Sequence, residues 1–359
     1  MTCYHPRKNF KTGGTLPSGA TEYIYCSYHT VAILKRNNVW EKLSFVPSKA
    51  LLSRWRMEGY QFSDDFIEIP CGHCIGCRLK KSRDWATRAM LELQDHEESC
   101  FITLTYDDHH LPPRLDAVDT ATGEIGLSPV HSLDVRDWQL FMKSLRKSLP
   151  DRKIRFLGCG EYGPKNMRPH FHAIIFGWCP SDLVFFKQNY KSQPVWTSPT
   201  LAKIWHRGFV TVGQVTFESC AYVARYTTKK LDSKFNLDQD SVIYGYRPEF
   251  LLCSRKPGIA HNYYDVHVKD IYKTDEIIIR RGIDNAIRGR PPKYFDKLYD
   301  IDYPEDASQL KEKRRLIAES SKNLKLSLTN LNYLDMLNAQ EHATIKKTLI
   351  LRRDHVDTT

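Results

Sequence analysis

Apolar and polar positions alternate along several stretches of the chain, and this pattern predicts β-strands. The clearest alternation runs over residues 101–106. Residues 154–161 and 170–177 are two more apolar runs, and the Gly and Pro residues between them predict the turn of a β-hairpin. Similar patterns predict further strands over 23–28, 30–34 and 208–216.

Other segments place apolar residues at helical spacing. Trp85, Ala89 and Leu93 recur every fourth residue, which predicts a helix over 82–93 with Ser82 as its N-cap. A second amphipathic helix is expected over 133–147, where four apolar side chains share one face: Trp138, Phe141, Met142 and Leu145. Further helices are expected over 181–190, 201–206, 217–231 and most of 304–354.

Length and charge narrow the classes of protein that fit. A chain of 359 residues can bury one large core or two modest ones. Lys and Arg number 53 and Asp and Glu 42, so the net charge is +11. This balance favours anionic partners, nucleic acid foremost, although on charge alone a merely soluble basic protein fits equally well.

The chain also lacks membrane and secretion signals. No window approaches the ~18 consecutive apolar residues of a membrane span. The first residues lack the apolar region of a signal peptide, so no membrane partner is expected. The ten cysteines are therefore expected to be reduced or metal-bound in a cytosol-like compartment.

Three cysteines follow one another at intervals of three residues: Cys71, Cys74 and Cys77. Thiolates at this spacing can face one soft cation, and Zn is the expected one. A structural site needs a fourth ligand. Cys3 and Cys26 are the candidates, with Cys3 preferred, and His73 can substitute. An iron–sulfur cluster uses the same spacing, and three buried, unliganded cysteines are the simplest alternative.

His170 and His172 lie two residues apart on a predicted strand, so both imidazoles project from the same face. The predicted hairpin folds Glu161 back toward them. Two imidazoles and one carboxylate leave coordination positions open, which is typical of a catalytic metal site rather than a closed structural one. Four further potential ligands, residues 107–110, are expected to form a solvated turn instead.

The predicted helix over 217–231 places Tyr222, Tyr226 and either Lys229 or Lys230 on one face. Taken alone, two tyrosines at helical spacing are explained by core packing. Combined with the metal ligands and the basic charge, they fit a metal-assisted transfer of a DNA phosphodiester to tyrosine. The metal would polarise the phosphate, and a lysine would add positive charge beside the phenol.

Such a transfer leaves a phosphotyrosine bond and a free 3′-hydroxyl. Because the phosphoester is retained, the strand can be rejoined without a nucleotide cofactor. Two tyrosines on one face permit alternation, since one can hold the 5′ end while the other cuts again. The mechanism requires the tyrosine hydroxyls to face the His170 and His172 side of the sheet.

Five segments resemble one known family. Residues 101–106, 168–174 and 222–230 are similar to the first motif, the His-hydrophobe-His motif and the two-tyrosine motif of HUH endonucleases. Residues 70–78 and 254–259 resemble segments of the replication initiators of small single-stranded DNA phages. The sequence thus resembles the initiators of the Microviridae, and most of all the gokushovirus type.

The resemblance implies an α+β fold in which helices flank a central antiparallel sheet. We expect a Cys-rich module over 1–80, an endonuclease core over 81–270 and a helical extension over 271–359. The family implies a Mg or Mn ion, with Glu161 placed like the third ligand of related viral initiators. One departure is Arg225, where relatives often carry Lys, which leaves open which basic residue assists.

The resemblance also implies a biological role. The expected activity is rolling-circle initiation by nicking a single-stranded DNA origin. The expected partners are that origin and the host helicase and polymerase, in the cytoplasm of a bacterial host.

Other functions use parts of the same residue set. A zinc hydrolase or a non-haem iron oxygenase also uses two histidines and a carboxylate, but neither explains the paired tyrosines or the charge. A non-catalytic nucleic-acid-binding protein with a zinc module explains charge and cysteines but gives no role to the metal ligands. A relaxase or transposase shares the chemistry and differs in purpose.

Overall fold

The computed structural model describes residues 3–119, 121–163, 166–189, 192–229, 245–281 and 285–353. The chain divides into two compact units, Met1–Arg78 with Ser320–Val356 and Leu79–Glu319 with Asp357–Thr359. The first boundary lies close to the expected end of a Cys-rich module at residue 80. The expected extension over 271–359 is instead shared between the units, because its first part belongs with the larger unit and its last helix with the N-terminal residues.

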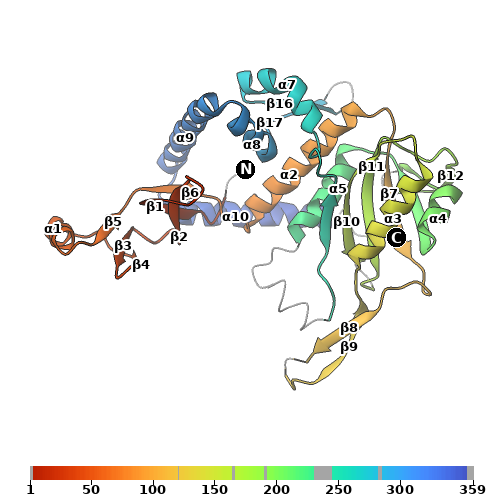
Figure 1. Cartoon of the computed structure of the whole chain (residues 1–359), viewed down its shortest axis with the longest axis horizontal. Helices are drawn as coiled ribbons and strands as arrows, with labels where there is room; N and C mark the ends of the chain where they lie inside the picture. Colours follow the sequence, from red (N-terminus) through yellow and green to blue (C-terminus); the bar gives the residue numbers. More distant parts are fainter. Residues whose placement is uncertain are drawn as a thin grey trace. The chain divides into compact units, whose positions relative to one another are not determined.

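The larger unit is built around one seven-stranded sheet (Figure 1). Every neighbouring pair of strands is antiparallel. The strand order is β12 (Val184–Gln188), β13 (Pro194–Thr197), β14 (Gly208–Gly213), β7 (Ser99–Tyr106), β11 (Pro169–Phe176), β10 (Arg155–Tyr162) and β15 (Phe250–Cys253). Helices pack on this sheet, so the predicted α+β fold class is confirmed.

Two apolar cores lie on opposite faces of the sheet. β7 alternates strictly between partly exposed and buried residues, and its buried ones join the core beneath α3 (Val135–Ser148) and α4 (Pro199–Trp205). The other face carries Leu157 and Ile174, which pack with α2 (Ile75–Glu92), α5 (Phe217–Lys229) and α7 (His261–Thr274). All eight side chains of β11 are buried, because this central strand is covered on both sides.

The remaining elements of the larger unit decorate the sheet. They are η1 (Leu93–Asp95), the hairpins β8 (Arg114–Val118) with β9 (Ile125–His131) and β16 (Ile277–Arg281) with β17 (Asn285–Gly289), then α8 (Lys293–Asp302) and the first part of α9 (Pro304–Ser327). The β8–β9 hairpin projects away from the sheet (Figure 1). Arg314 of α9 binds the carboxylates of Asp275 and Asp296, which ties α9 to α7 and α8.

The smaller unit contains two three-stranded sheets and helices from both ends of the chain. One sheet has the order β2 (Thr21–Cys26), β1 (Arg7–Thr15), β6 (Phe66–Ile69), and the other β4 (Val39–Leu43), β3 (Ala32–Arg36), β5 (Gln61–Ser63). Its helices are α1 (Lys49–Met57) and α10 (Tyr333–Arg353). Lys322, at the end of α9, lies 2.7 Å from Glu68 and 3.8 Å from the ring centre of Tyr333.

Two expectations about local structure were wrong. Residues 181–190 contain the strand β12 rather than a helix; β12 is the edge strand of the sheet and exposes apolar side chains, so it lacks a two-residue alternation. Ser82 is not an N-cap, because α2 already begins at Ile75 and Ser82 lies in its interior. Among the described helices, none is both long and apolar enough to cross a membrane.

Candidate active site

The hairpin of β10 and β11 brings three potential metal ligands together. Its register pairs Glu161 with His170 and Cys159 with His172. Glu161 is 2% exposed and the two histidines are 8% exposed. One ligand atom from each of the three residues lies within 4.8 Å of the others. We call Glu161, His170 and His172 the metal-ligand cluster; the predicted residues therefore do converge.

The contacts of the cluster concentrate on one carboxylate oxygen. Oε1 of Glu161 lies 2.6 Å from Nε2 of His170 and 2.7 Å from Nε2 of His172. The second oxygen, Oε2, is buried and has no hydrogen-bond partner in the described part of the chain. A buried carboxylate oxygen without a donor is costly unless a cation satisfies it. The cluster therefore fits a divalent metal ion.

Neighbouring groups fix the orientation of both imidazole rings. Nδ1 of His170 lies 3.0 Å from the backbone oxygen of Arg168, an acceptor, so this nitrogen donates. Nδ1 of His172 lies 2.9 Å from Oγ1 of Thr103, and Phe101 stacks on the His172 ring with centres 5.6 Å apart. In both rings Nε2 is directed toward Glu161, as outer partners of metal-binding histidines commonly arrange.

Sequence reasoning did not assign these supporting roles to Thr103 and Phe101. Both lie on β7, the strand whose alternation was the clearest in the sequence. The alternation indicated that 101, 103 and 105 share a face, but not that β7 pairs with β11. Only the strand order supplied that information.

The carboxyl group of Glu161 is held in its ionised form. Burial opposes ionisation, but the charge of His172 and hydrogen bonds from His170 and His172 outweigh it and hold the pKa of Glu161 well below its ordinary value. An ionised carboxylate at neutral pH is the form that binds a divalent cation.

Tyr222 of α5 points into the metal-ligand cluster. Its hydroxyl donates a hydrogen bond of 2.9 Å to Oε1 of Glu161. Its ring meets the His172 ring nearly at right angles, with centres 5.0 Å apart. The hydroxyl therefore lies on the side of the sheet that carries both histidines, as the proposed chemistry requires.

The other residues of the predicted tyrosine face are only partly covered by the structure. Tyr226 and Lys229 belong to α5, one and two turns after Tyr222. Their side chains, and all of Lys230, lie outside the described residues.

Residues 107–110 form a turn, as expected. Oδ1 of Asp107 accepts hydrogen bonds from the backbone N–H groups of His109, at 3.0 Å, and His110, at 2.9 Å. Asp108 binds the guanidinium group of Arg168. These contacts occupy the turn's two carboxylates with local donors.

A second group of ligands lies in the smaller unit. Four cysteines bring their sulfur atoms within 4.8 Å of one another: Cys3, Cys71, Cys74 and Cys77. We call these the cysteine cluster. Backbone N–H groups donate to its sulfurs, with distances of 3.2 Å from Cys71 to Cys3 and 3.3 Å from Tyr4 to Cys74. Four sulfurs with N–H donors fit a tetrahedral thiolate site for zinc.

The structure separates the candidates for the fourth thiolate position. Cys3 is the residue that joins the other three. Cys26 ends β2, where it is buried in a small apolar core with Phe10 and Ile33. His73 is exposed and only its backbone N–H contacts the cluster, at 3.4 Å from the sulfur of Cys71.

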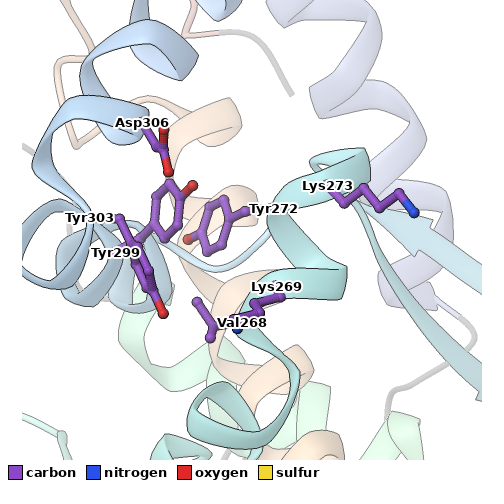
Figure 2. Close-up of a pocket in the computed structure, with 7 residues that line it drawn as sticks. All are labelled: Val268, Lys269, Tyr272, Lys273, Tyr299, Tyr303 and Asp306. Atoms are coloured by element: carbon purple, nitrogen blue, oxygen red, sulfur yellow. The ribbon is translucent and has the colours of Figure 1, made fainter.

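A pocket of about 330 Å³ lies between α7 and α8 (Figure 2). Tyr272 and Tyr299 lie side by side there, and their rings stack at 3.7 Å. None of the predicted site residues lines this pocket. The stacked rings fill one another's faces, so they serve to pack α7 on α8.

The chain was compared with known proteins. The family model described as replication-associated protein ORF2 matches residues 99–231, which contain the metal-ligand cluster and Tyr222. The replication-associated protein ORF2 of Spiroplasma virus 4 is 34% identical over 79% of this chain and 85% of its own length. Protein VP4 of Bdellovibrio phage phiMH2K, also named replication-associated, is 30% identical over 79% of this chain and 86% of its own.

A third relative extends the same pattern. The replication-associated protein ORF4 of Chlamydia phage 1 is 31% identical over 69% of this chain and 57% of its own length. No solved structure matches the chain. The sequence motifs, the antiparallel sheet and these relatives agree: the chain belongs to the family of replication-associated proteins of Microviridae-type phages.

Proposed function

We propose that the protein initiates rolling-circle replication by nicking a single-stranded DNA origin through metal-assisted attack of a tyrosine. The observation that carries this proposal is the contact between Tyr222 and Glu161. A phenol placed 2.9 Å from the carboxylate of a three-ligand metal site lies where a phosphate bound to that metal would be attacked. The names of the relatives, all replication-associated proteins, support the same role.

The reaction is a transesterification. The phenolic oxygen of Tyr222 forms a bond to phosphorus as the bond from phosphorus to the 3′ oxygen breaks. The phenol loses one proton and the 3′ oxygen gains one, so the step is balanced and needs no nucleotide cofactor. The products are a 5′-phosphotyrosine link and a free 3′-hydroxyl, and the reverse attack by a 3′-hydroxyl rejoins the strand.

The metal would be Mg or Mn, held by Glu161, His170 and His172. When bound, it polarises the scissile phosphate and offsets charge that develops in the transition state. Thr103, Phe101 and the backbone of Arg168 hold the two imidazoles in place for it. In this proposal Lys229 or Lys230 adds positive charge beside the nucleophile.

Tyr226 is the second nucleophile in this proposal. It follows Tyr222 by one turn of α5, which is the spacing that two alternating nucleophiles need. Tyr222 acts first, because its hydroxyl contacts Glu161 before any DNA is bound. The host helicase and polymerase would extend the 3′ end in the cytoplasm of the bacterial host.

We further propose that the cysteine cluster binds one structural Zn ion. Thiolates select zinc over Mg and Mn, so the two proposed sites take different metals. This zinc would link the N-terminal residues to the start of α2. Ile75, the first residue of that helix, donates its N–H to Glu341 of α10 at 3.4 Å, so α10 is held at the same point.

The test is incubation of the full chain with labelled single-stranded origin DNA and Mn. We expect a covalent protein–DNA adduct that EDTA abolishes and that His170→Ala fails to form. A non-catalytic binding protein predicts DNA binding without any adduct. Binding of the DNA by the wild-type protein with no adduct at any Mn concentration would overturn the nickase proposal.

A further inference from the structure

The row of side chains that contains the metal-ligand cluster continues across the sheet. In the register, Glu161 of β10 pairs with His170 of β11, His170 with Thr105 of β7, and Thr105 with Phe209 of β14. Directly opposed residues of antiparallel strands project from the same face. Phe209 therefore lies on the face that carries both histidines, which we call the cluster face.

Phe209 differs from the rest of this row in its exposure. Its side chain is 69% exposed, while Glu161 and His170 are buried. Its neighbours in the strand, Val210 and Val212, point to the opposite face and are buried in the core that includes α3 and α4. Packing thus explains the two valines but gives no role to the phenyl ring.

Helix α5 explains why the cluster face changes from buried to exposed. This helix packs on β10, β11 and β15, where it covers the apolar part of the face and brings Tyr222 to the cluster. Neighbouring strands are about 4.8 Å apart, so Phe209 lies two strands and roughly 10 Å from His170. An exposed aromatic ring at that distance is within reach of a nucleotide whose phosphate occupies the cluster.

The surroundings of Phe209 suit a nucleic acid strand. Thr211, which is partly exposed, follows it on the cluster face and pairs with Thr103 of β7. Further along, Lys187 of β12 pairs with Val195, which lies on the same face because its neighbour Trp196 pairs with Val212 of the opposite face. A hydroxyl and an ammonium group beside an aromatic ring are the donor and stacking groups that single strands use.

We propose that Phe209 is a stacking platform for a base of the single-stranded DNA substrate close to the scissile phosphate. This rests on the proposed function, since it places the substrate strand across the cluster face from β11 toward β12. Stacking on a phenyl ring tolerates any base, so Phe209 would hold the strand in position without reading its sequence.

The test measures DNA affinity in EDTA, where no nicking can occur. Fluorescence anisotropy of a labelled oligo-dT titrated with the full chain gives the dissociation constant. We expect Phe209→Ala to raise it about 5- to 150-fold and Phe209→Trp to keep it near the wild-type value. Phe185→Ala is the matched control: Phe185 is 60% exposed on the neighbouring edge strand, but it pairs with Trp196 and so lies on the opposite face.

Photo-crosslinking identifies the contact directly. An oligonucleotide that contains 5-iodo-deoxyuridine is irradiated with the protein, and the peptides are mapped by mass spectrometry. An adduct on Phe209 and none on Phe185 supports the proposal. Wild-type affinity in Phe209→Ala overturns it, and so does an equal loss in Phe185→Ala. A change of sedimentation coefficient without a change of affinity would assign Phe209 to a protein interface instead.

Failure of this inference is distinguishable from failure of the nickase. If the wild-type protein forms the covalent adduct with Mn while Phe209→Ala binds DNA normally, only the stacking role is lost. If no adduct forms, the nickase proposal fails, and the comparison of affinities in EDTA still shows whether Phe209 contacts DNA.

Discussion

Replacing Glu161 by Gln tests whether the metal-ligand cluster binds a divalent ion. The substitution keeps the size and shape of the side chain and removes its negative charge. Glu161 is the only carboxylate in the cluster and is 2% exposed, so water cannot compensate for the lost charge. The amide nitrogen also takes the place of one carboxylate oxygen and cannot coordinate a cation.

The size of the effect follows from the contacts of Glu161. Loss of a charged ligand costs at least as much as loss of one charged hydrogen bond, about 1.5–3 kcal/mol. That range corresponds to a loss of Mn affinity of about 10- to 150-fold. It is a lower bound, because a direct bond to the metal is stronger than a hydrogen bond.

The assay is calorimetric titration of MnCl₂ into protein stripped of metal, at neutral pH. The matched control is Glu92→Gln, since Glu92 is also buried, at 3% exposure, but it binds Arg155 and lies outside the cluster. We expect Glu92→Gln to bind Mn like the wild-type protein. Equal Mn affinity in Glu161→Gln and wild type, with both variants folded by circular dichroism, would refute the reasoning.

Three further predictions follow from the two clusters and α5. Because the pKa of Glu161 is lowered in the folded chain, the stability from its ionised form is complete above its unfolded pKa of about 4.3 and is lost as pH falls through the lower folded value. In EDTA, urea unfolding should therefore show a stability gap between wild type and Glu161→Gln at neutral pH that narrows only in strong acid; a gap that is constant with pH contradicts this. Cys74→Ser should lower bound zinc from one ion per chain toward none by elemental analysis, while the matched Cys26→Ser keeps it; unchanged zinc in Cys74→Ser counts against the cysteine site. Tyr226→Phe should still form the first covalent adduct but fail to transfer the strand a second time, as resolved on denaturing gels; loss of the first adduct would reverse the assigned order of the two tyrosines.

The local parts of the site could be predicted from the sequence. His170 and His172 lie two residues apart on a strand, and a short turn leads back to Glu161, so hairpin geometry alone brings the three together. The same holds for Cys71, Cys74 and Cys77, whose spacing places them around one point. These predictions needed only contacts between residues close in sequence.

The remainder depends on contacts between distant segments. Nothing in the sequence sets β7 and β14 beside β11, so the roles of Thr103 and Phe209 became visible only with the strand order. The choice of Cys3 over Cys26 likewise required the fold of the N-terminal strands. The edge strand β12 was predicted as a helix because an edge strand can expose apolar side chains on both faces and then lacks the usual alternation.

The most direct test of the central claim is to identify the residue that carries the DNA. The full chain is mixed with labelled single-stranded origin DNA and Mn, the adduct is digested with protease and nuclease, and mass spectrometry locates the bound nucleotide. The account predicts a 5′-phosphotyrosine at Tyr222 and no first adduct in Tyr222→Phe. An adduct on a residue outside α5, or one that forms unchanged in Tyr222→Phe, would contradict it.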